Sequence, residues 1–305
     1  MTNIIEATNK LLWYQLPLEN KEDLIKFLDE TNTRDFDKEK FEKDFYLTTI
    51  LHRISTEIPE INFKWWTCLN KIYFPYFRLS EDLDFSLSTE YDFVNTNWKR
   101  EKFAKQFRDK MKELTKTIWR KLNDDEFHHK KAQWHENLKK KEYTYLKYEI
   151  SYPSIYGKED ETIKIELTYT DKQCLEPIHK PIQSIFIDPL TKDNIFNEKT
   201  TQCLDVQEMV AEKCRACLTR RYPAIRDFFD LRYLQSQWID ILANKGIIKA
   251  KCNEVSDRKR TLHDKYDELE KQIQTHLIPV ANDLYDFNLR EIYDKMIELQ
   301  KELFE

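Results

Sequence analysis

Glycine is almost absent from this sequence. Its 305 residues include only two, Gly157 and Gly246, where an average usage of ~7% would give about twenty. The phosphate-binding loops of Rossmann enzymes and P-loop NTPases need several glycines within a few residues, and so does the nucleophile elbow of α/β-hydrolases. Two glycines this far apart cannot form any of these motifs. The sequence therefore argues against all three classes of enzyme.

Long apolar runs and paired cysteine motifs are also missing. No apolar run approaches the ~18 residues that cross a bilayer, and the first six residues lack the basic and apolar segments of a signal peptide. Only Cys214 and Cys217 form a C-x-x-C pair, whereas a zinc ribbon needs two such pairs. We expect these two cysteines to be small buried residues of a helix. We expect the protein itself to be soluble and cytoplasmic, with no membrane association.

Hydrophobic spacing predicts helices towards both ends of the chain and strands between them. Helical periodicity runs through residues 1–60, where Asp37 is the expected N-cap of a helix over Phe41–Leu51. It returns from Val206 onwards, with a helical hairpin that is broken near Pro279. A short helix is expected over residues 68–73 and a turn over residues 152–157. The alternating patterns that predict strands are residues 83–87, 145–150 and 162–169.

Positive charge is concentrated in residues 99–147, which hold sixteen Lys and Arg against eight Asp and Glu. The local net charge of +8 leaves −13 for the rest of a chain whose total is −5. The first part, residues 99–121, has helical spacing, and the later part interleaves lysines with aromatic residues. Such a mixture suits a phosphate backbone with unpaired bases; the other interpretation is a solvated helix face and loop. The candidate RNA-binding residues are Lys130, Lys131, Lys139, Lys140 and Lys141.

A pair of acidic residues, Asp82 and Asp84, indicates catalytic chemistry. Both point to one face of the strand that begins near them, and two carboxylates this close repel each other unless a cation lies between them. Hard oxygen ligands favour Mg²⁺, which at such a site binds a nucleoside triphosphate and activates an attacking hydroxyl. Glu166, in the strand expected over residues 162–169, is the candidate third acid. A D-x-D pair alone is a weak motif.

Four blocks of sequence around this pair resemble one protein family. The central block covers residues 63–85: with glycines in place of Trp65 and Trp66 it would read F-K-G-G-T-x-L-x-K at residues 63–71, then R-x-S-E-D-L-D-F at residues 78–85. The upstream block is Glu42-Lys43-Asp44, and the downstream blocks are residues 211–216 and 226–231. In this order the blocks resemble the AbiEii-type nucleotidyltransferase toxins of the DNA polymerase β superfamily, over about residues 40–235.

The resemblance implies an α+β fold. Its core would be a polymerase-β-type nucleotidyltransferase domain, a small mixed sheet flanked by helices, followed by a mainly helical C-terminal part. We expect the nucleotidyltransferase domain at residues 1–205, with the basic segment 99–147 as an insertion. The helical C-terminal domain is expected at residues 206–305.

The resemblance also implies roles for individual residues. Asp82 and Asp84 would hold Mg²⁺ and would form the catalytic set with Glu166 and Asp227. The nucleotide phosphates would lie at the turn of residues 65–66 and the N-terminus of the helix that follows, where backbone amides can reach them. Lys213 matches a family lysine that contacts the triphosphate. A solvated lysine and a salt-bridged aspartate are the alternatives for Lys213 and Asp227. The implied nucleotide-binding residues are Lys64, Trp65, Trp66, Thr67, Lys71 and Lys213.

The sequence departs from the family at Trp65 and Trp66, which stand where paired glycines are expected. We expect that tryptophan cannot adopt the positive φ that a glycine uses there, and that its indole fills the space of a phosphate. We interpret the pair as an inactivating change, made by deliberate substitution in a toxic protein. The alternatives are natural divergence, in which the indoles stack on a base, and core tryptophans on a rearranged turn.

The function expected from these residues is Mg²⁺-dependent transfer of nucleotides from an NTP to RNA. The tRNA 3′ end as acceptor comes from the resemblance alone, and so does the setting. That setting is a toxin–antitoxin or phage-defence pair, in which tRNA modification blocks translation and a cognate antitoxin protein is the partner. The basic segment agrees with a polyanionic acceptor. The alternatives are transfer to a protein or small molecule, and a catalytically silent nucleic-acid-binding module.

Overall fold

The computed structural model describes residues 21–87, most of 98–109, 129–137, 142–157, 160–168, 173–254 and 262–304, with single positions left out inside some of these ranges. The chain divides into two compact units. The first comprises residues 1–171 and 177–203, and the second comprises residues 172–176 and 204–305. Each unit buries its own apolar residues, for example Phe45 and Phe85 in the first and Leu231 and Met296 in the second.

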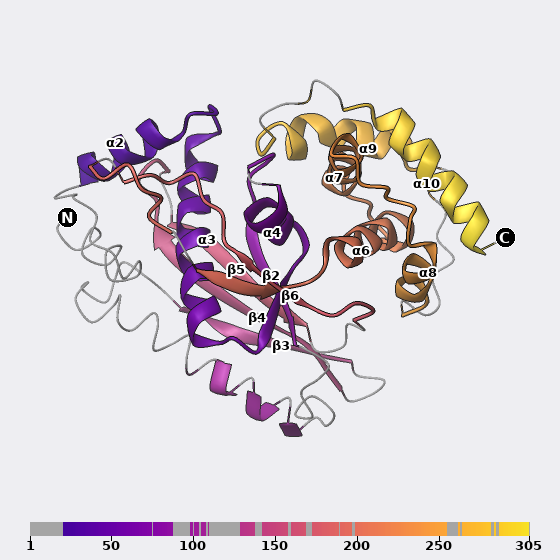
Figure 1. Ribbon diagram of the computed structural model, residues 1–305, viewed down its shortest axis with the longest axis horizontal. Helices are drawn as coiled ribbons and strands as arrows, with labels where there is room; N and C mark the ends of the chain where they lie inside the picture. The colour runs from indigo at the N-terminus through magenta and orange to yellow at the C-terminus, as the bar shows by residue number, and fades with distance from the viewer. Residues whose placement is uncertain are drawn as a thin grey trace. The chain divides into compact units, whose positions relative to one another are not determined.

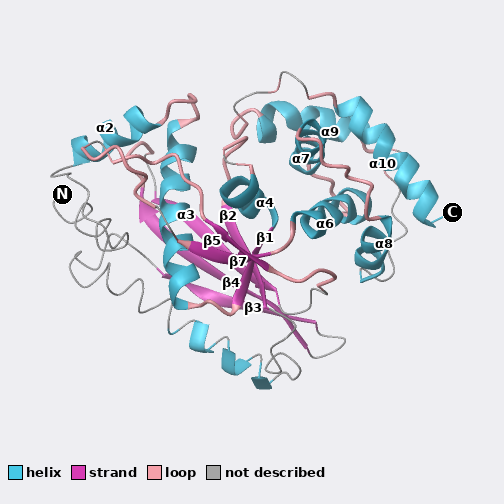
Figure 2. Ribbon diagram, in the orientation of Figure 1, coloured by secondary structure: helices cyan, strands magenta, loops and turns pink. Residues whose placement is uncertain are grey.

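A mixed β-sheet forms the centre of the first unit. Its described strands are β1 (Ile61–Lys64), β2 (Asp82–Leu87), β3 (His129–Asn137), β4 (Glu142–Pro153), β5 (Asp160–Thr168), β6 (Ile178–Pro181) and β7 (Thr200–Cys203). They lie side by side in the order β3-β4-β5-β2-β1-β7-β6 (Figure 2). The pairs β2–β5 and β1–β7 are parallel, and the other neighbours are antiparallel. The helices that accompany the sheet are α2 (Lys21–Thr31), α3 (Lys38–Glu57), α4 (Trp65–Cys68) and the π-helical turn η1 (Leu69–Tyr73).

Alternation along β2 separates the core face of the sheet from its polar face. Leu83 and Phe85 are fully buried on one face, because successive side chains of a strand point in opposite directions. Helix α3 covers this face and contacts β2, β5 and β7 (Figure 1). The rings of Tyr46 on α3 and Tyr152 on β4 lie 4.6 Å apart. The even-numbered residues of β2 consequently lie on the opposite face.

Helix α3 begins at the predicted position. The Asp37 carboxylate accepts a hydrogen bond of 3.0 Å from the Lys40 backbone N–H, which satisfies one of the free amides of the first turn. Further along, Phe45 packs against Phe186 and Phe196 with ring centroids 5.1 and 6.3 Å apart. A segment distant in sequence therefore closes the outer side of this helix.

The second unit is helical in its described part. Its elements are α6 (Val206–Thr219), α7 (Ile225–Ser236), α8 (Lys245–Glu254), α9 (Tyr266–Gln272), the π-helical turn η3 (Ile273–Leu277) and α10 (Leu289–Phe304). A buried ion cluster joins α8 to α6. Lys251 Nζ lies 2.7 Å from Glu208 and 2.9 Å from Glu212, and all three side chains are at most 5% exposed. Although burial disfavours the ammonium, the two carboxylates raise the pKa of Lys251 above its ordinary value.

The α+β fold is confirmed, and so are most of the elements predicted from periodicity. Three predicted strands correspond to β2, β4 and β5, the short helix corresponds to α4 and η1, and α6 begins at Val206. The hairpin broken near Pro279 corresponds to α9, η3 and α10. None of the described helices is both long enough and apolar enough to cross a membrane. Cys214 and Cys217 are buried on α6, as expected.

The prediction was wrong for part of the basic segment. Residues 129–137, which carry Lys130 and Lys131, form strand β3 at one end of the sheet rather than a loop. Lys139, Lys140 and Lys141 lie outside the described residues, and so do residues 110–121 of the expected helix. Within the part of that helix that is described, Phe103 and Phe107 are buried, as helical spacing predicts.

Candidate active site

Strand register brings the three predicted acids onto one face of the sheet. Asp82 and Asp84 lie two residues apart on β2 and therefore point to the same side. In the parallel ladder with β5, Asp82 pairs with Lys164 and Asp84 pairs with Glu166. The Asp84 side chain is buried, and Asp82, at the first position of the strand, is partly exposed. The site thus lies where β2 begins.

Cationic residues flank these acids along the sheet. In register with Asp84 and Glu166 lie Lys64 of β1 on one side and Lys147 of β4 on the other. The row therefore reads cation, acid, acid, cation across four neighbouring strands. Lys64 Nζ also donates a hydrogen bond of 2.7 Å to the Thr168 hydroxyl. Because like charges on adjacent strands destabilise a sheet, the outer lysines offset the repulsion between the two inner carboxylates.

The chemistry of these donors fits a magnesium ion. Mg²⁺ in nucleotide enzymes is held by one or two carboxylates and completes its coordination with water and substrate phosphates. Asp82 and Asp84 supply two carboxylates from one strand face. Among the described residues, no three His, Cys, Asp or Glu side chains gather closely enough to hold a metal by themselves. Two carboxylates on one strand face suit an ion that takes its remaining ligands from water and phosphate oxygens.

The turn between β1 and α4 keeps a conformation that favours glycine. Trp65 has a φ of 60°, in the left-handed region that bulky residues rarely occupy. The expectation that tryptophan cannot adopt this conformation was therefore wrong for Trp65. Trp66 follows as an ordinary helical residue of α4. Trp65 therefore occupies a strained conformation that a glycine would adopt without steric penalty.

Both indoles lie against cations. Lys64 Nζ is 4.6 Å from the centroid of the Trp65 ring, and the guanidinium carbon of Arg78 is 4.2 Å from that of Trp66. These are cation–π distances. Next to the indoles, the Thr67 hydroxyl donates a hydrogen bond of 2.5 Å to the carbonyl of Asp82. The turn is therefore fastened directly to the start of the strand that carries the acids.

Lys71, expected near the phosphates, lies inside the core. Its ammonium lies 2.5 Å from Asp44 Oδ2 and donates to the Tyr76 hydroxyl at 2.9 Å. Neither Lys71 nor Asp44 has any exposed surface. Burial disfavours the charge, but the adjacent Asp44 carboxylate and Tyr76 hydroxyl hold the pKa of Lys71 above its ordinary value. An ammonium enclosed in this way has a structural role and does not face a ligand.

The Glu42-Lys43-Asp44 block organises the same region, although its sequence alone indicates no role for these residues. Glu42 accepts hydrogen bonds from the Ser154 hydroxyl at 2.7 Å and from the Ile155 backbone N–H at 2.8 Å. Asp44 pairs with Lys71, as described. Glu42 therefore fixes the turn after β4, and Asp44 fixes the side chain of Lys71. The only signal for this in the sequence is the resemblance of the block to the family.

Lys43, the middle residue of this block, is a buried cation near the start of β2. Its side chain is 10% exposed and its Nζ lies 3.8 Å from Glu161. Burial lowers the pKa of Lys43, while the nearby Glu81, Glu161 and Asp82 oppose that shift. Lys43 therefore adds positive potential beside the first acid of the site.

In the second unit, Lys213 and Asp227 lie together. Lys213 on α6 is 2% exposed, and its Nζ lies 3.0 Å from Asp227 and 3.9 Å from Asp230, both on α7. Asp227 also pairs with Arg220 at 2.5 Å. These residues form a buried ion cluster in the second unit. The contacts of Asp227 are those of a salt-bridged aspartate, which was the alternative to a catalytic role.

The chain is similar to known proteins both in its sequence and in its structure. A family model described as "Nucleotidyl transferase AbiEii toxin, Type IV TA system" matches residues 67–303. A search of curated proteins found no match. Among solved structures, JHP933 from Helicobacter pylori has 15% sequence identity and a TM-score of 0.46, with 88% of this chain and 93% of that chain covered. An H. pylori protein named for a proposed nucleotidyltransferase activity has 15% identity and a TM-score of 0.44, with 88% and 96% covered. Because the family model spans most of the sequence, the chain belongs to the AbiEii nucleotidyl transferase toxin family.

Proposed function

We propose that this protein is a Mg²⁺-dependent nucleotidyltransferase toxin that transfers nucleotides from an NTP to RNA. The observation that carries the proposal is the alignment of Asp84 with Glu166, beside Asp82 on one polar sheet face. That face lies next to the turn which Thr67 ties to Asp82. Family membership supplies the reaction class, and the acids and the turn supply the residues that would perform it.

In the reaction, the hydroxyl oxygen of the acceptor attacks the α-phosphorus of the NTP and pyrophosphate leaves. Mg²⁺ bound at Asp82 and Asp84 would neutralise charge on the phosphates and favour the alkoxide form of the attacking group. Glu166, held next to Asp84, is the carboxylate placed to accept the proton of the hydroxyl. Lys64 and the amides at the start of α4 are the groups of this chain that would bind phosphate oxygens. Lys71 has no part in this proposal because its ammonium is enclosed.

The tryptophans weaken the nucleotide site in this proposal. The backbone at Trp65 keeps the left-handed turn, but both indoles now stand where phosphates would approach the amides. Their cations are engaged as well, since Lys64 and Arg78 lie over the two rings. We therefore expect weak NTP binding by the present chain and stronger binding by its Trp65→Gly/Trp66→Gly variant, the glycine-restored chain.

The proposed acceptor is the 3′ end of tRNA, and the proposed partner is a cognate antitoxin protein. Support comes from the family, described as a toxin of a type IV toxin–antitoxin system, and from the net charge of +8 in residues 99–147. A polyanionic acceptor needs such a basic patch on a chain that is otherwise acidic. Reversal of Lys139, Lys140 and Lys141 to Glu should weaken RNA binding. It should also make the slope of log K against log salt concentration shallower, by about 0.7 to 0.9 for each phosphate contact that is lost.

The test is to incubate the present and glycine-restored chains with labelled NTPs, Mg²⁺ and either total RNA or total protein. We expect the glycine-restored chain to label RNA of tRNA size and the present chain to label far less. An Asp82→Asn variant of the glycine-restored chain is the control and should label nothing. Label in the protein fraction would instead favour the alternative acceptor.

A second candidate is a catalytically silent RNA-binding module. The observation that favours it is the pair of half-buried indoles under Lys64 and Arg78, which leaves little room for a triphosphate. This candidate predicts RNA binding by both chains and no labelling by either one. Equal, tight NTP binding by the two chains would show that the indoles of Trp65 and Trp66 do not block the nucleotide site.

A further inference from the structure

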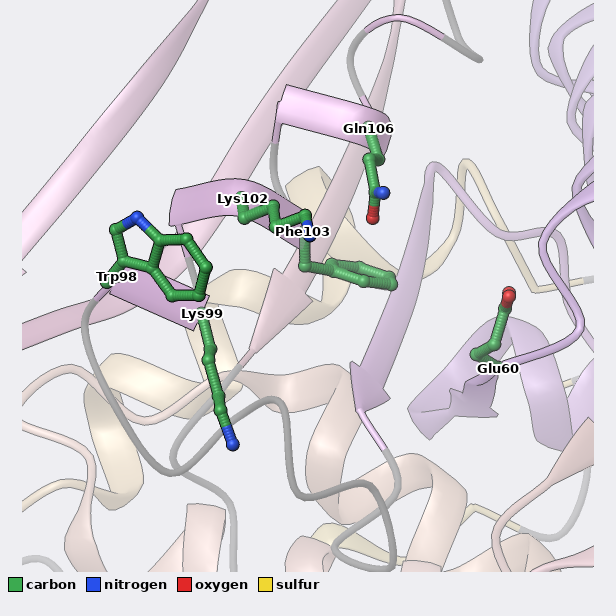
Figure 3. Close-up of a pocket in the computed structure, with 6 residues that line it drawn as sticks. All are labelled: Glu60, Trp98, Lys99, Lys102, Phe103 and Gln106. Atoms are coloured by element: carbon green, nitrogen blue, oxygen red, sulfur yellow. The ribbon is translucent and has the colours of Figure 1, made fainter.

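Two exposed aromatic rings among the described residues have a cation above them. In the first unit, Trp98 is 67% exposed and Lys102 Nζ lies 5.6 Å from its ring centre. Figure 3 shows this ring at one end of a pocket, directly before the basic segment that is already proposed to bind RNA. In the second unit, Tyr222 is 66% exposed and the guanidinium carbon of Arg221 lies 5.2 Å from its ring centre. This second pair has no part in the proposed function.

The loop between α6 and α7, which carries this second ring, is held in place from both sides. The Gln272 side chain on α9 accepts a hydrogen bond of 3.0 Å from the Ile225 backbone N–H and donates one of 3.1 Å to the Pro223 carbonyl. At the other end of the loop, Arg220 pairs with Asp227 at 2.5 Å. A side chain that is presented by an ordered loop loses less conformational entropy when it binds a ligand. The loop is therefore built to present the side chains at its tip.

Charge is balanced beneath this loop and positive at its tip. Beneath it, Lys213 and Arg220 are paired with two buried acids, Asp227 and Asp230. Arg221 is exposed and takes no part in that cluster. No carboxylate of the described residues forms an ion pair with it. The tip therefore presents an aromatic ring beside a positive charge, which is the combination that single-stranded nucleic acid uses for stacking and for phosphate contacts.

The exposure of Trp238, a third aromatic ring, has a different explanation. Its backbone N–H bonds the Gln235 carbonyl at 3.0 Å, and the N–H of Ile239 bonds the Leu234 carbonyl at 3.1 Å. With a φ of 62°, Trp238 occupies the left-handed position that ends a helix. Its side chain is 97% exposed because of where α7 ends, and among the described residues no cation lies over it. Trp238 is therefore a matched control for an exposed ring without a cation.

We propose that the loop of residues 220–224 binds an unpaired nucleotide of the RNA acceptor. The base stacks on the open face of the Tyr222 ring. The strand runs past the edge of that ring, so that a phosphate next to the stacked nucleotide reaches the guanidinium of Arg221. This inference rests on the proposed RNA acceptor, and it adds a docking position in the second unit that involves none of the acids on β2.

The surroundings of the ring favour RNA over a protein partner. The exposed side chains of this loop are those of Arg221 and Tyr222, whereas Pro223 is buried. The centre of a protein interface is a wider apolar patch from which charge is depleted. A stacked base with one phosphate contact needs only a ring and a cation. The loop therefore fits a nucleic-acid strand.

The test measures binding of fluorescent single-stranded RNA hexamers to the full chain by anisotropy, without NTP. The probes are a hexamer of adenosines and the same hexamer with its two central bases removed. Tyr222→Ala should weaken binding of the intact hexamer by about 5- to 150-fold, the usual range for loss of one stacked base. Tyr222→Phe should bind as the parent chain does, because the ring alone is needed for stacking. Trp238→Ala should have no effect.

Two further measurements locate the strand on this loop. Arg221→Gln should weaken binding and make the slope of log K against log salt concentration shallower by about 0.7, the value for one phosphate contact of a single strand. A hexamer with a central photoreactive 4-thiouridine should cross-link to the peptide that contains Tyr222. Because both side chains are exposed, these variants should keep the melting temperature of the parent chain.

The outcomes separate this inference from the proposed function. If the chain binds the hexamer and Tyr222→Ala binds it equally well, the loop proposal is overturned while the RNA acceptor stands. An equal loss in Tyr222→Phe and Tyr222→Ala would overturn the stacking, and so would equal binding of the intact and base-depleted hexamers. Competition by adenosine monophosphate at the concentration of the hexamer would show a site for free nucleotide instead. If Tyr222→Ala loses binding but no RNA is labelled in the transfer assay, the loop proposal stands and nucleotidyl transfer fails.

Discussion

Lys71 and Lys213 are two lysines that the family resemblance places near the nucleotide, and the structure buries both against aspartates. Lys71, in the first unit, forms a closed pair with Asp44, and neither side chain has exposed surface. Lys213, in the second unit, is shared between Asp227 and Asp230, and Asp227 is also bound by Arg220, whose side chain is 33% exposed. One site is sealed, whereas the other reaches solvent through an arginine. Both lysines are thus buried, and they differ in whether the aspartate that holds the lysine also has a partly exposed partner.

The largest effect on stability is expected at the sealed pair. Lys71→Ala leaves the Asp44 carboxylate buried without its cation, which for buried pairs costs about 3–5 kcal/mol. Chemical denaturation of the variant measures the loss. The matched control is Lys71→Met/Asp44→Leu, which removes both charges and should recover most of the stability. A loss below about 1 kcal/mol in Lys71→Ala would show that the pair is not sealed.

His52 sharpens the comparison, because it is a buried imidazole and the charges that act on it among the described residues are positive. Burial, together with the positive charges of Lys199 and Arg53, lowers its pKa from 6.5 to about 4. The contribution of neutral His52 to the free energy of unfolding is therefore fully present above pH 6.5. It is lost as the pH falls from 6.5 towards 4, because in that range the unfolded chain binds a proton at His52 and the folded chain does not. The loss amounts to about 3 kcal/mol. Denaturation between pH 7 and pH 4 measures it, and His52→Phe should flatten the dependence in that window.

The open cluster should tolerate the loss of its lysine better. In Lys213→Ala, Arg220 still pairs with Asp227, so we expect a loss of about 1–3 kcal/mol in unfolding free energy. In the glycine-restored chain the same change should lower the rate of nucleotidyl transfer by ~10²–10³ and leave RNA affinity intact. Lys213→Arg should rescue the rate only in part, since a guanidinium does not reproduce a compact ammonium. Full transfer activity in Lys213→Ala would remove this residue from the site.

The smallest effect on stability is expected at the acids of β2. Asp82→Ala removes one of several acids on a polar face and should change unfolding free energy by no more than about 0.5 kcal/mol, with a gain in stability if repulsion dominates. In the glycine-restored chain it should nevertheless abolish transfer. Melting curves without metal, beside transfer assays with Mg²⁺, measure the two effects. A large fall in melting temperature would show that Asp82 supports the fold rather than the chemistry.

The sequence predicted the parts of this fold that depend on local pattern. The period of two in residues 82–87 gave both the strand and the common face of Asp82 and Asp84, and Asp37 gave the start of α3. Strands β1, β6 and β7 have four residues each, which is too short to show a period. Strand β3 was missed because its sequence is charged and polar and lies at one end of the sheet.

The position of the acids in the fold was more predictable than that of the lysines. Alternation in its own strand predicts the face on which Glu166 lies, but its register beside Asp84 depends on a parallel pairing that no local pattern encodes. The burial of Lys71 depends on Asp44, 27 residues earlier on another helix. A motif specifies the type of residue at a position, whereas the direction of a long side chain is set by tertiary packing.

The left-handed backbone at Trp65 also determines what restoring glycine would do to the fold. Because Trp65 already has a φ of 60°, Trp65→Gly requires no change in the path of the chain, and it removes a bulky residue from a region that disfavours one. The substitution that is proposed to open the nucleotide site should therefore also relieve strain at the turn.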